Sequence, residues 1–123
     1  MSTDTMPRTM FSDFLHYLST GEDPHAVISA DLEGDMNFPH STFRLRGKAE
    51  FDQLRAQVSN QPWSLRVEKV EPTATGFLAV IDIDTVHEGP GGAETDTSRT
   101  ISTVTVDEGR ITRLAHWCTG QLR

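Results

Sequence analysis

The strongest constraint in this 123-residue sequence is a change of hydrophobic period after Pro62. Beyond that proline, apolar and polar residues alternate along stretches rich in β-branched side chains, a pattern typical of strands with one buried face. The alternating stretches are residues 63–72, 76–88, 94–108 and 110–119. Turns rich in glycine, at 89–93 and at Gly109, separate the last three. The second half of the chain therefore predicts a four-stranded antiparallel meander.

The first half of the chain shows helical spacing instead. Apolar residues recur three and four positions apart over residues 8–18, which predicts an amphipathic helix. A second helix is predicted over 24–32, because Asp23 is a favoured N-cap and Pro24 suits the first helical position. The same apolar spacing predicts a third helix over 48–58.

The remaining segments of the first half are short. Residues 34–40 are expected to form a brief strand, 41–47 a loop or a second short strand, and the polar residues 1–7 a flexible tail. We interpret residues 1–123 as one α+β domain, with three N-terminal helices packed on a strongly curved, mostly antiparallel sheet. Such a cone has an open mouth suited to a small molecule.

Composition narrows the classes of function. The net charge is −7 and no basic stripe is visible, which argues against nucleic-acid partners and against an anionic membrane surface. No apolar run approaches the roughly 18 residues of a membrane-spanning helix. Cys118 is the single cysteine, so neither an intrachain disulfide nor a cysteine zinc site is expected, and a reducing cytoplasm is the simplest compartment. The histidines are dispersed, so we expect no metal and no cofactor.

Three stretches of the sequence carry a family resemblance: "VISADLEGDMNFP", "RLRGKAEFDQLRA" and "VTVDEGRITRLAHW". With the order of elements, they resemble the SnoaL-like branch of the NTF2-like superfamily over residues 8–119. The resemblance implies a cone-shaped fold, a hydrophobic small-molecule ligand, cofactor-free chemistry and a homodimer formed through the outer face of the sheet. The family includes polyketide cyclases, ketosteroid isomerases, limonene-epoxide hydrolases and non-catalytic binding modules, so it predicts fold more sharply than function.

The sequence departs from two of these enzyme patterns. Phe38 stands where ketosteroid isomerases carry their general-base aspartate, and Tyr17 lies one turn from the place of their helical tyrosine, so steroid isomerisation is not expected. By resemblance to limonene-epoxide hydrolases, His116 replaces a catalytic carboxylate, Asp84 matches an aspartate, and Asp82 replaces an arginine. That catalytic triad is therefore incomplete.

Strand alternation predicts which side chains share the pocket. With a turn near Gly91, the hairpin of 76–88 and 94–108 places Asp84 near Ser98 and Asp82 near Thr100, on one face with further hydroxyls. On the last strand, Leu114, His116 and Cys118 share this pocket face. The other face is expected to be apolar and to form the dimer interface, with Phe77, Ile81, Ile83, Ile101, Ile111 and Trp117.

The leading hypothesis is acid–base catalysis on a hydrophobic substrate, by cyclisation, isomerisation or hydrolytic opening. His116 would be the proton shuttle, because imidazole titrates near pH 6.5, and Asp84 would orient it and raise its pKa. Asp82 would be a second polar contact. Predicted ligand contacts are Tyr17, Phe38, His40, Trp63, Thr100, Leu114 and Cys118. The alternative is that His116 is a hydrogen-bonded structural residue in a non-catalytic module that binds a ligand or a protein.

Overall fold

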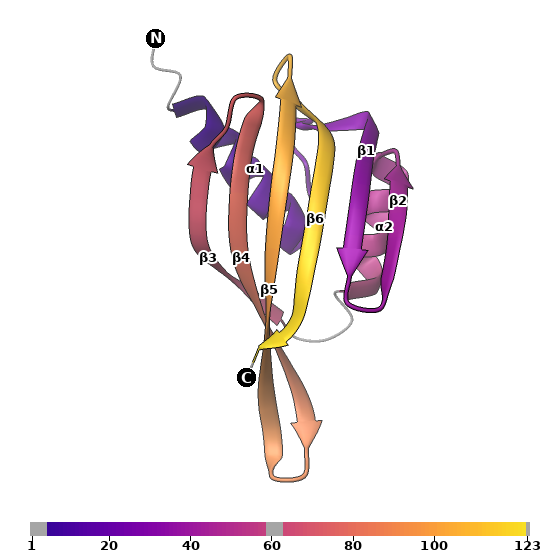
Figure 1. The fold of residues 1–123 in the computed structure, drawn as a ribbon, viewed down its shortest axis with the longest axis vertical. Coiled ribbons are helices and arrows are strands. Elements are labelled where there is room, and N and C mark those ends of the chain that lie inside the picture. Colours follow the sequence, from indigo (N-terminus) through magenta and orange to yellow (C-terminus); the bar gives the residue numbers. More distant parts are fainter. Residues whose placement is uncertain (1–4, 59–62, 123) are drawn as a thin grey trace.

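The computed structural model describes the backbone of residues 5–58 and 63–122, and the side chains of 10–56 and 64–119. The described chain contains two helices and six strands (Figure 1). They are α1 (Thr5–Thr20), β1 (Ile28–Phe38), β2 (Ser41–Arg46), α2 (Lys48–Val58), β3 (Trp63–Pro72), β4 (Gly76–Gly89), β5 (Gly92–Asp107) and β6 (Arg110–Leu122). The predicted tail therefore ends by Thr5, and residues 1–4 lie outside the described residues. Within the described ranges, no helix combines the length and the hydropathy needed to cross a membrane.

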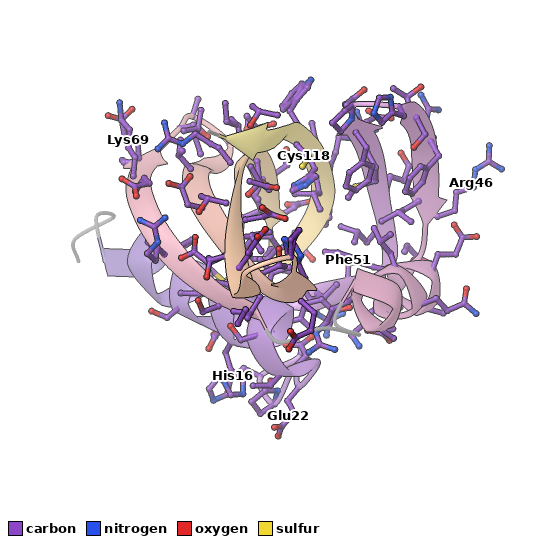
Figure 2. All side chains as sticks on the ribbon, turned by 90° about the horizontal axis from the view of Figure 1, so that it is seen from below. His16, Glu22, Arg46, Phe51, Lys69 and Cys118 are labelled. Atoms are coloured by element: carbon purple, nitrogen blue, oxygen red, sulfur yellow. The ribbon has the colours of Figure 1, made fainter. Side chains whose placement is uncertain are left out.

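All six strands form one sheet in the order β2-β1-β6-β5-β4-β3. Neighbouring strands run antiparallel except β1 and β6, which are parallel. The sheet arches over α1 and α2, which both lie on its concave side (Figure 2). The hairpin that joins β4 and β5 extends well beyond the neighbouring strands (Figure 1). The predicted α+β class and the four-stranded meander are confirmed, whereas the prediction of three helices is wrong.

The helix predicted over 24–32 does not form. The carboxylate of Asp23 instead closes a turn, because it accepts hydrogen bonds from the backbone nitrogens of Val27 at 2.9 Å and Ile28 at 3.0 Å. Ala26 in that turn has a φ of 52°, which a right-handed helix excludes. From Ile28 onward the chain pairs with β6 on one side and, further along, with β2 on the other. The turn at Asp23 and the strand pairing that begins at Ile28 thus outweigh a weak helical spacing.

The C-terminal end of α1 is fastened to α2. The guanidinium of Arg55 donates to the backbone carbonyls of Tyr17, Leu18 and Ser19 at 2.9–3.0 Å. These carbonyls lie in the last turn of α1, where the regular helical hydrogen bonds end, and the carbonyl of Tyr17 also accepts from the backbone nitrogen of Gly21 at 2.8 Å. The phenol of Tyr17 also donates to the carboxylate of Asp52 on α2. These hydrogen bonds therefore fix the position of α1 relative to α2 beneath the sheet.

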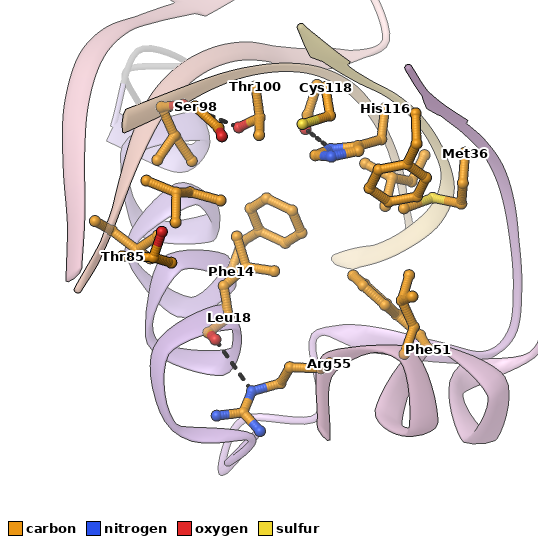
Figure 3. Close-up of a pocket in the computed structure, with 17 residues that line it drawn as sticks. Phe14, Leu18, Met36, Phe51, Arg55, Thr85, Ser98, Thr100, His116 and Cys118 are labelled. Carbon is orange, nitrogen blue, oxygen red and sulfur yellow. Dashed lines mark hydrogen bonds between the residues drawn. The ribbon is translucent and has the colours of Figure 1, made fainter. Parts of the chain in front are cut away.

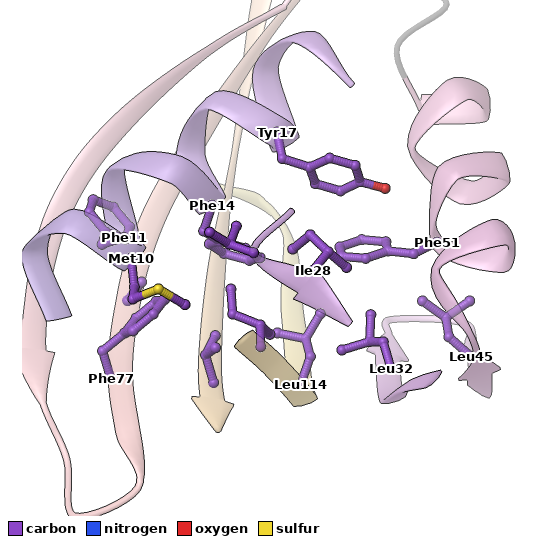
Figure 4. Close-up of a cluster of buried hydrophobic side chains, with 14 of the residues drawn as sticks. Met10, Phe11, Phe14, Tyr17, Ile28, Leu32, Leu45, Phe51, Phe77 and Leu114 are labelled. Atoms are coloured by element: carbon purple, nitrogen blue, oxygen red, sulfur yellow. The ribbon is translucent and has the colours of Figure 1, made fainter. Parts of the chain in front are cut away.

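The hydrophobic core lies between the concave face and the helices (Figure 4). The rings of Phe11 and Phe14 pack edge-on against Phe77, with centroids 5.8 and 5.9 Å apart. The ring of Tyr17 packs at 5.2 Å against Phe51. All five side chains are buried. Aromatic packing thus fills the space beside the middle of α1.

The register of β4 against β5 decides which side chains face this core. Asp84 lies opposite Thr97 and Asp82 opposite Arg99, one position from the predicted pairing. Because side chains alternate across a strand, that one-residue shift moves every β4 side chain to the opposite face. Asp82 and Asp84 therefore point outward.

A β-bulge in β6 decides a second set of faces. Val106 pairs with Ile111 and Thr105 pairs with Arg113, so Thr112 is an extra residue in the ladder. The bulge changes the alternation, and Ile111 is fully buried on the concave side together with Leu114. The prediction that placed Ile111 with Trp117 on the outer face is therefore wrong.

Candidate ligand pocket

A cavity of about 220 Å³ lies between the concave sheet face and the two helices (Figure 3). This is below the roughly 300–1,000 Å³ that pockets for drug-sized ligands occupy, so the cavity has room only for a molecule smaller than those. Most of the lining is apolar: Phe14, Leu18, Met36, Phe38, Phe51, Leu54, Leu65, Ile81, Ile83 and Leu114. Both helices and every strand except β2 contribute to it.

The polar lining is concentrated on the sheet. It consists of Thr85, Ser98, Thr100, Ser102, His116 and Cys118 from β4, β5 and β6. Arg55 also lines the cavity, but its guanidinium binds carbonyls of α1 and so is committed to the helix end (Figure 3). No carboxylate is among the described residues that line this space. The cavity therefore favours an uncharged, mostly apolar ligand.

His116 is held by contacts on two sides. Its Nδ1 lies 2.9 Å from the hydroxyl oxygen of Ser102, which is the residue directly opposite it on β5. The ring of Phe38 packs against the imidazole with the centroids 5.7 Å apart. Nε2 has no hydrogen-bond partner among the described residues, and the ring lines the cavity. The imidazole thus presents one ring nitrogen to a ligand.

Burial lowers the pKa of His116 from 6.5 to about 4. The cause is desolvation, because the imidazolium would lose its water without gaining a counter-charge. The predicted rise in this pKa, which required a neighbouring carboxylate, is therefore wrong. At neutral pH the pocket holds a neutral imidazole.

The predicted contact between His116 and Asp84 does not form, because the two side chains lie on opposite faces of the sheet. Asp84 instead accepts two hydrogen bonds from Arg66, at 2.7 and 3.2 Å, and one from Thr97 at 2.6 Å. Asp82 makes a matching bidentate pair with Arg99 at 2.8 and 3.1 Å. These arginines hold the pKa of both carboxyls below its usual value. The aspartates thus form ion pairs on the outer face.

The other residues predicted to contact the ligand divide into two groups. The structure places Phe38, Thr100, Leu114 and Cys118 in the pocket lining. Tyr17 is fully buried and bonds to Asp52, outside the lining, while His40 is exposed in the turn between β1 and β2. Trp63 begins β3, and its side chain lies outside the described residues.

No family model and no curated protein sequence matches this chain. Solved structures do match. IdmH from Streptomyces antibioticus, a proposed polyketide cyclase, has a TM-score of 0.75 at 12% identity, covering 92% of this chain and 91% of its own. A proposed SnoaL-like polyketide cyclase from Shewanella putrefaciens has a TM-score of 0.70 at 7% identity, covering 91% and 88%. An epoxide hydrolase from M. tuberculosis, described as LEH-like, has a TM-score of 0.68 at 19% identity, covering 93% and 83%.

Proteins named as NTF2-like are among the other matches, at TM-scores of 0.68 and 0.70. This chain has the NTF2-like fold. The resemblance inferred from three sequence stretches is thus confirmed at the level of the fold, and SnoaL-like proteins are among its structural neighbours. Because one fold hosts many chemistries, function has to be argued from the pocket itself.

Sequence reasoning missed several residues of this NTF2-like pocket. The helical spacing of apolar residues predicted the buried faces of both helices, but it could not show which side chains on those faces line a cavity and which fill the core. The lining residues missed in this way are Phe14, Leu18, Phe51 and Leu54. Ser102 is one of the further hydroxyls predicted on the pocket face of β5. Its position opposite His116 depends on the bulge at Thr112, which no residue type in that stretch predicts. The described residues hold no cluster of three or more histidine, cysteine or carboxylate side chains that could bind a metal ion.

The low pKa of His116 makes the stability of the fold depend on pH. Between pH 6.5 and about 4, His116 is protonated in the unfolded chain but neutral in the folded chain. The free energy of unfolding is therefore highest above pH 6.5 and decreases as the pH falls through this range. From pH 7.5 to 4.5 we expect the unmodified chain to lose about 2–3 kcal/mol more of its free energy of unfolding than His116→Gln loses. Urea denaturation at both pH values measures this.

The matched control for this comparison is His16→Gln, at an exposed histidine of α1. It should show the same loss as the unmodified chain. Equal losses in the unmodified chain and in His116→Gln would contradict a buried neutral imidazole.

Proposed function

We propose that this chain binds a small, uncharged and mainly apolar molecule in the cavity of its NTF2-like cone, with His116 as the main polar contact. The observation that carries the proposal is a cavity of about 220 Å³ with apolar walls and one unpartnered imidazole nitrogen. Apolar surface in such a cavity favours the transfer of a hydrophobic ligand out of water. The structural neighbours named as polyketide cyclases and as an epoxide hydrolase support a small-molecule ligand.

The test of binding uses 1-fluoronaphthalene, a probe without charge or strong polar groups, followed by fluorine NMR. We expect saturable binding to the unmodified chain, and at least tenfold weaker binding to Ile83→Trp, because the indole would occupy the cavity that Ile83 lines. Val86→Trp is the control, since Val86 lies on the same strand with an exposed side chain outside the lining. Equal affinity of both variants would contradict this site.

Cofactor-free catalysis on a bound carbonyl compound is the finer proposal. A neutral imidazole can hydrogen bond to the carbonyl oxygen or take a proton from the neighbouring carbon, and either action promotes enolisation. Cyclisation and isomerisation are compatible with this chemistry. Hydrolytic opening of an epoxide is less compatible with this pocket, because no carboxylate that could activate water is among the described lining residues. The second candidate, a non-catalytic binding module, is favoured by that same lack of a strong base.

Deuterium exchange distinguishes the enzyme from the binding module. In D2O the chain should accelerate exchange at the methyl group of acetophenone, and His116→Gln should lower that acceleration at least tenfold while the chain stays folded. His16→Gln is the control that should retain it. Binding of acetophenone without exchange above the buffer rate would identify a binding module, and full exchange in His116→Gln would exclude the imidazole from the reaction.

The outer face of the sheet supports a homodimer, although only Ile101 and Trp117 remain there from the predicted interface. Phe77, Ile81 and Ile83 face the interior instead. An apolar row remains outside: Val80 pairs with Ile101, and Ile101 with Trp117, whose side chain is 43% exposed. No described helix covers this face, since both lie on the other side (Figure 2). We propose that a second copy covers this row.

Sedimentation velocity tests the dimer at micromolar concentrations. The unmodified chain should sediment as a dimer, and Trp117→Arg should shift it to the monomer because it places a charge in the apolar row. The control is Val67→Arg, at an equally exposed apolar residue on β3, opposite Ile81, which faces the interior. A monomeric unmodified chain would rule out the proposed interface.

A further inference from the structure

The pairing of Ser102 with His116 carries an inference about the kind of ligand. Ser102 is 3% exposed, and its hydroxyl has one partner among the described residues, Nδ1 of His116 at 2.9 Å. The imidazole is neutral at pH 7, so one ring nitrogen carries a proton and the other an acceptor lone pair. In the hydrogen bond between Ser102 and His116, either the serine hydroxyl donates to Nδ1 or Nδ1–H donates to the serine oxygen.

In the first arrangement, the hydroxyl of Ser102 donates to Nδ1 and the ring proton lies on Nε2. The serine proton is then satisfied, and only the Nε2–H faces the cavity without a protein partner. In the second arrangement, Nδ1–H donates to the serine oxygen and Nε2 is an acceptor. The buried proton of the serine hydroxyl then has no acceptor among the described residues, and Nε2 has no donor. A buried unmade hydrogen bond is costly, so the first arrangement is the more stable.

We propose that Ser102 is a positioning residue that keeps the proton of His116 on Nε2, so that the pocket selects ligands with an acceptor oxygen, such as a ketone, an ether or an epoxide. The inference rests on the proposed function, because it assumes that the cavity is where the ligand binds. An ammonium group, which can only donate, would find no acceptor at this nitrogen. For a carbonyl ligand, His116 would donate to the oxygen, and a water molecule would take the proton from the neighbouring carbon.

The surroundings of the ring support this assignment. Phe38 packs on the imidazole and restricts its rotation, so Nε2 stays directed away from Ser102. The hydroxyl of Thr100, the next residue on this face of β5, donates to the carbonyl of Ile81 at 3.0 Å and is committed to the sheet. Ser102 is thus the hydroxyl that determines where the ring proton lies.

The direct test is nitrogen NMR of the chain labelled with ¹⁵N in its histidine rings, at pH 7 and without ligand. The His116 signals, identified by their loss in His116→Gln, should show a pyrrole-type Nε2 and a pyridine-type Nδ1. Ser102→Ala removes the donor to Nδ1, and both His116 signals should move toward the average of the two tautomers. Ser98→Ala, at another serine of β5 that lines the pocket without contacting His116, should leave them unchanged.

A pyridine-type Nε2, or a charged ring at pH 7, would overturn the proposal whether or not any ligand binds. The second measurement compares two probes of equal shape by proton–nitrogen correlation spectra. Acetophenone, which has an acceptor oxygen, should bind about fivefold more tightly than α-methylstyrene, which has none. Ser102→Ala should lower that preference about twofold, because roughly half of the rings would still carry the proton on Nε2. Equal affinities in the unmodified chain would count against the inference. Failure of both probes to bind, with the expected ring signals, would instead contradict the proposed function alone.

Discussion

The hydrogen-bond register of β4, β5 and β6 is the constraint on which the pocket depends. It places Ser102 opposite His116 and Thr100 opposite Cys118, so the polar side chains of three strands meet on one wall. Since side chains alternate, a slip of one residue between two strands would send a whole set of side chains to the other face. The extra residue at Thr112 is part of this register, because it lets Ile111 fill the core while His116 faces the cavity.

The scarcity of polar groups in the cavity determines what its one imidazole can do. Desolvation makes His116 a weak base with a pKa of about 4, and no described carboxylate is close enough to restore its charge. The same dry surroundings strengthen any hydrogen bond that the neutral ring makes to a ligand. A pocket of this kind discriminates by shape and by one directional contact, and an ionic ligand would lose its hydration there without compensation.

The acidic pair of β4 is explained by structure on the outer face. Asp82 is nearly inaccessible, with 3% of its surface exposed, yet it keeps its charge because Arg99 binds it through two hydrogen bonds. Asp84 is bound in the same way by Arg66 of β3. The two pairs tie β3, β4 and β5 together, beside the apolar row that contains Ile101 and Trp117. Asp82 and Asp84 thus have a structural role here, in place of the catalytic one first expected.

The sequence by itself determined the α+β class, helices at α1 and α2, the long strands of the second half and the inward position of His116, because hydrophobic period is a local property of the chain. Only the tertiary structure decided that 24–32 form a turn and the start of β1 instead of a helix, since that choice depends on strand partners distant in sequence. It also decided the faces of Asp82 and Asp84, and the meeting of Ser102 with His116. These depend on hairpin register and on one bulged residue, and an error of a single position in either reverses the outcome.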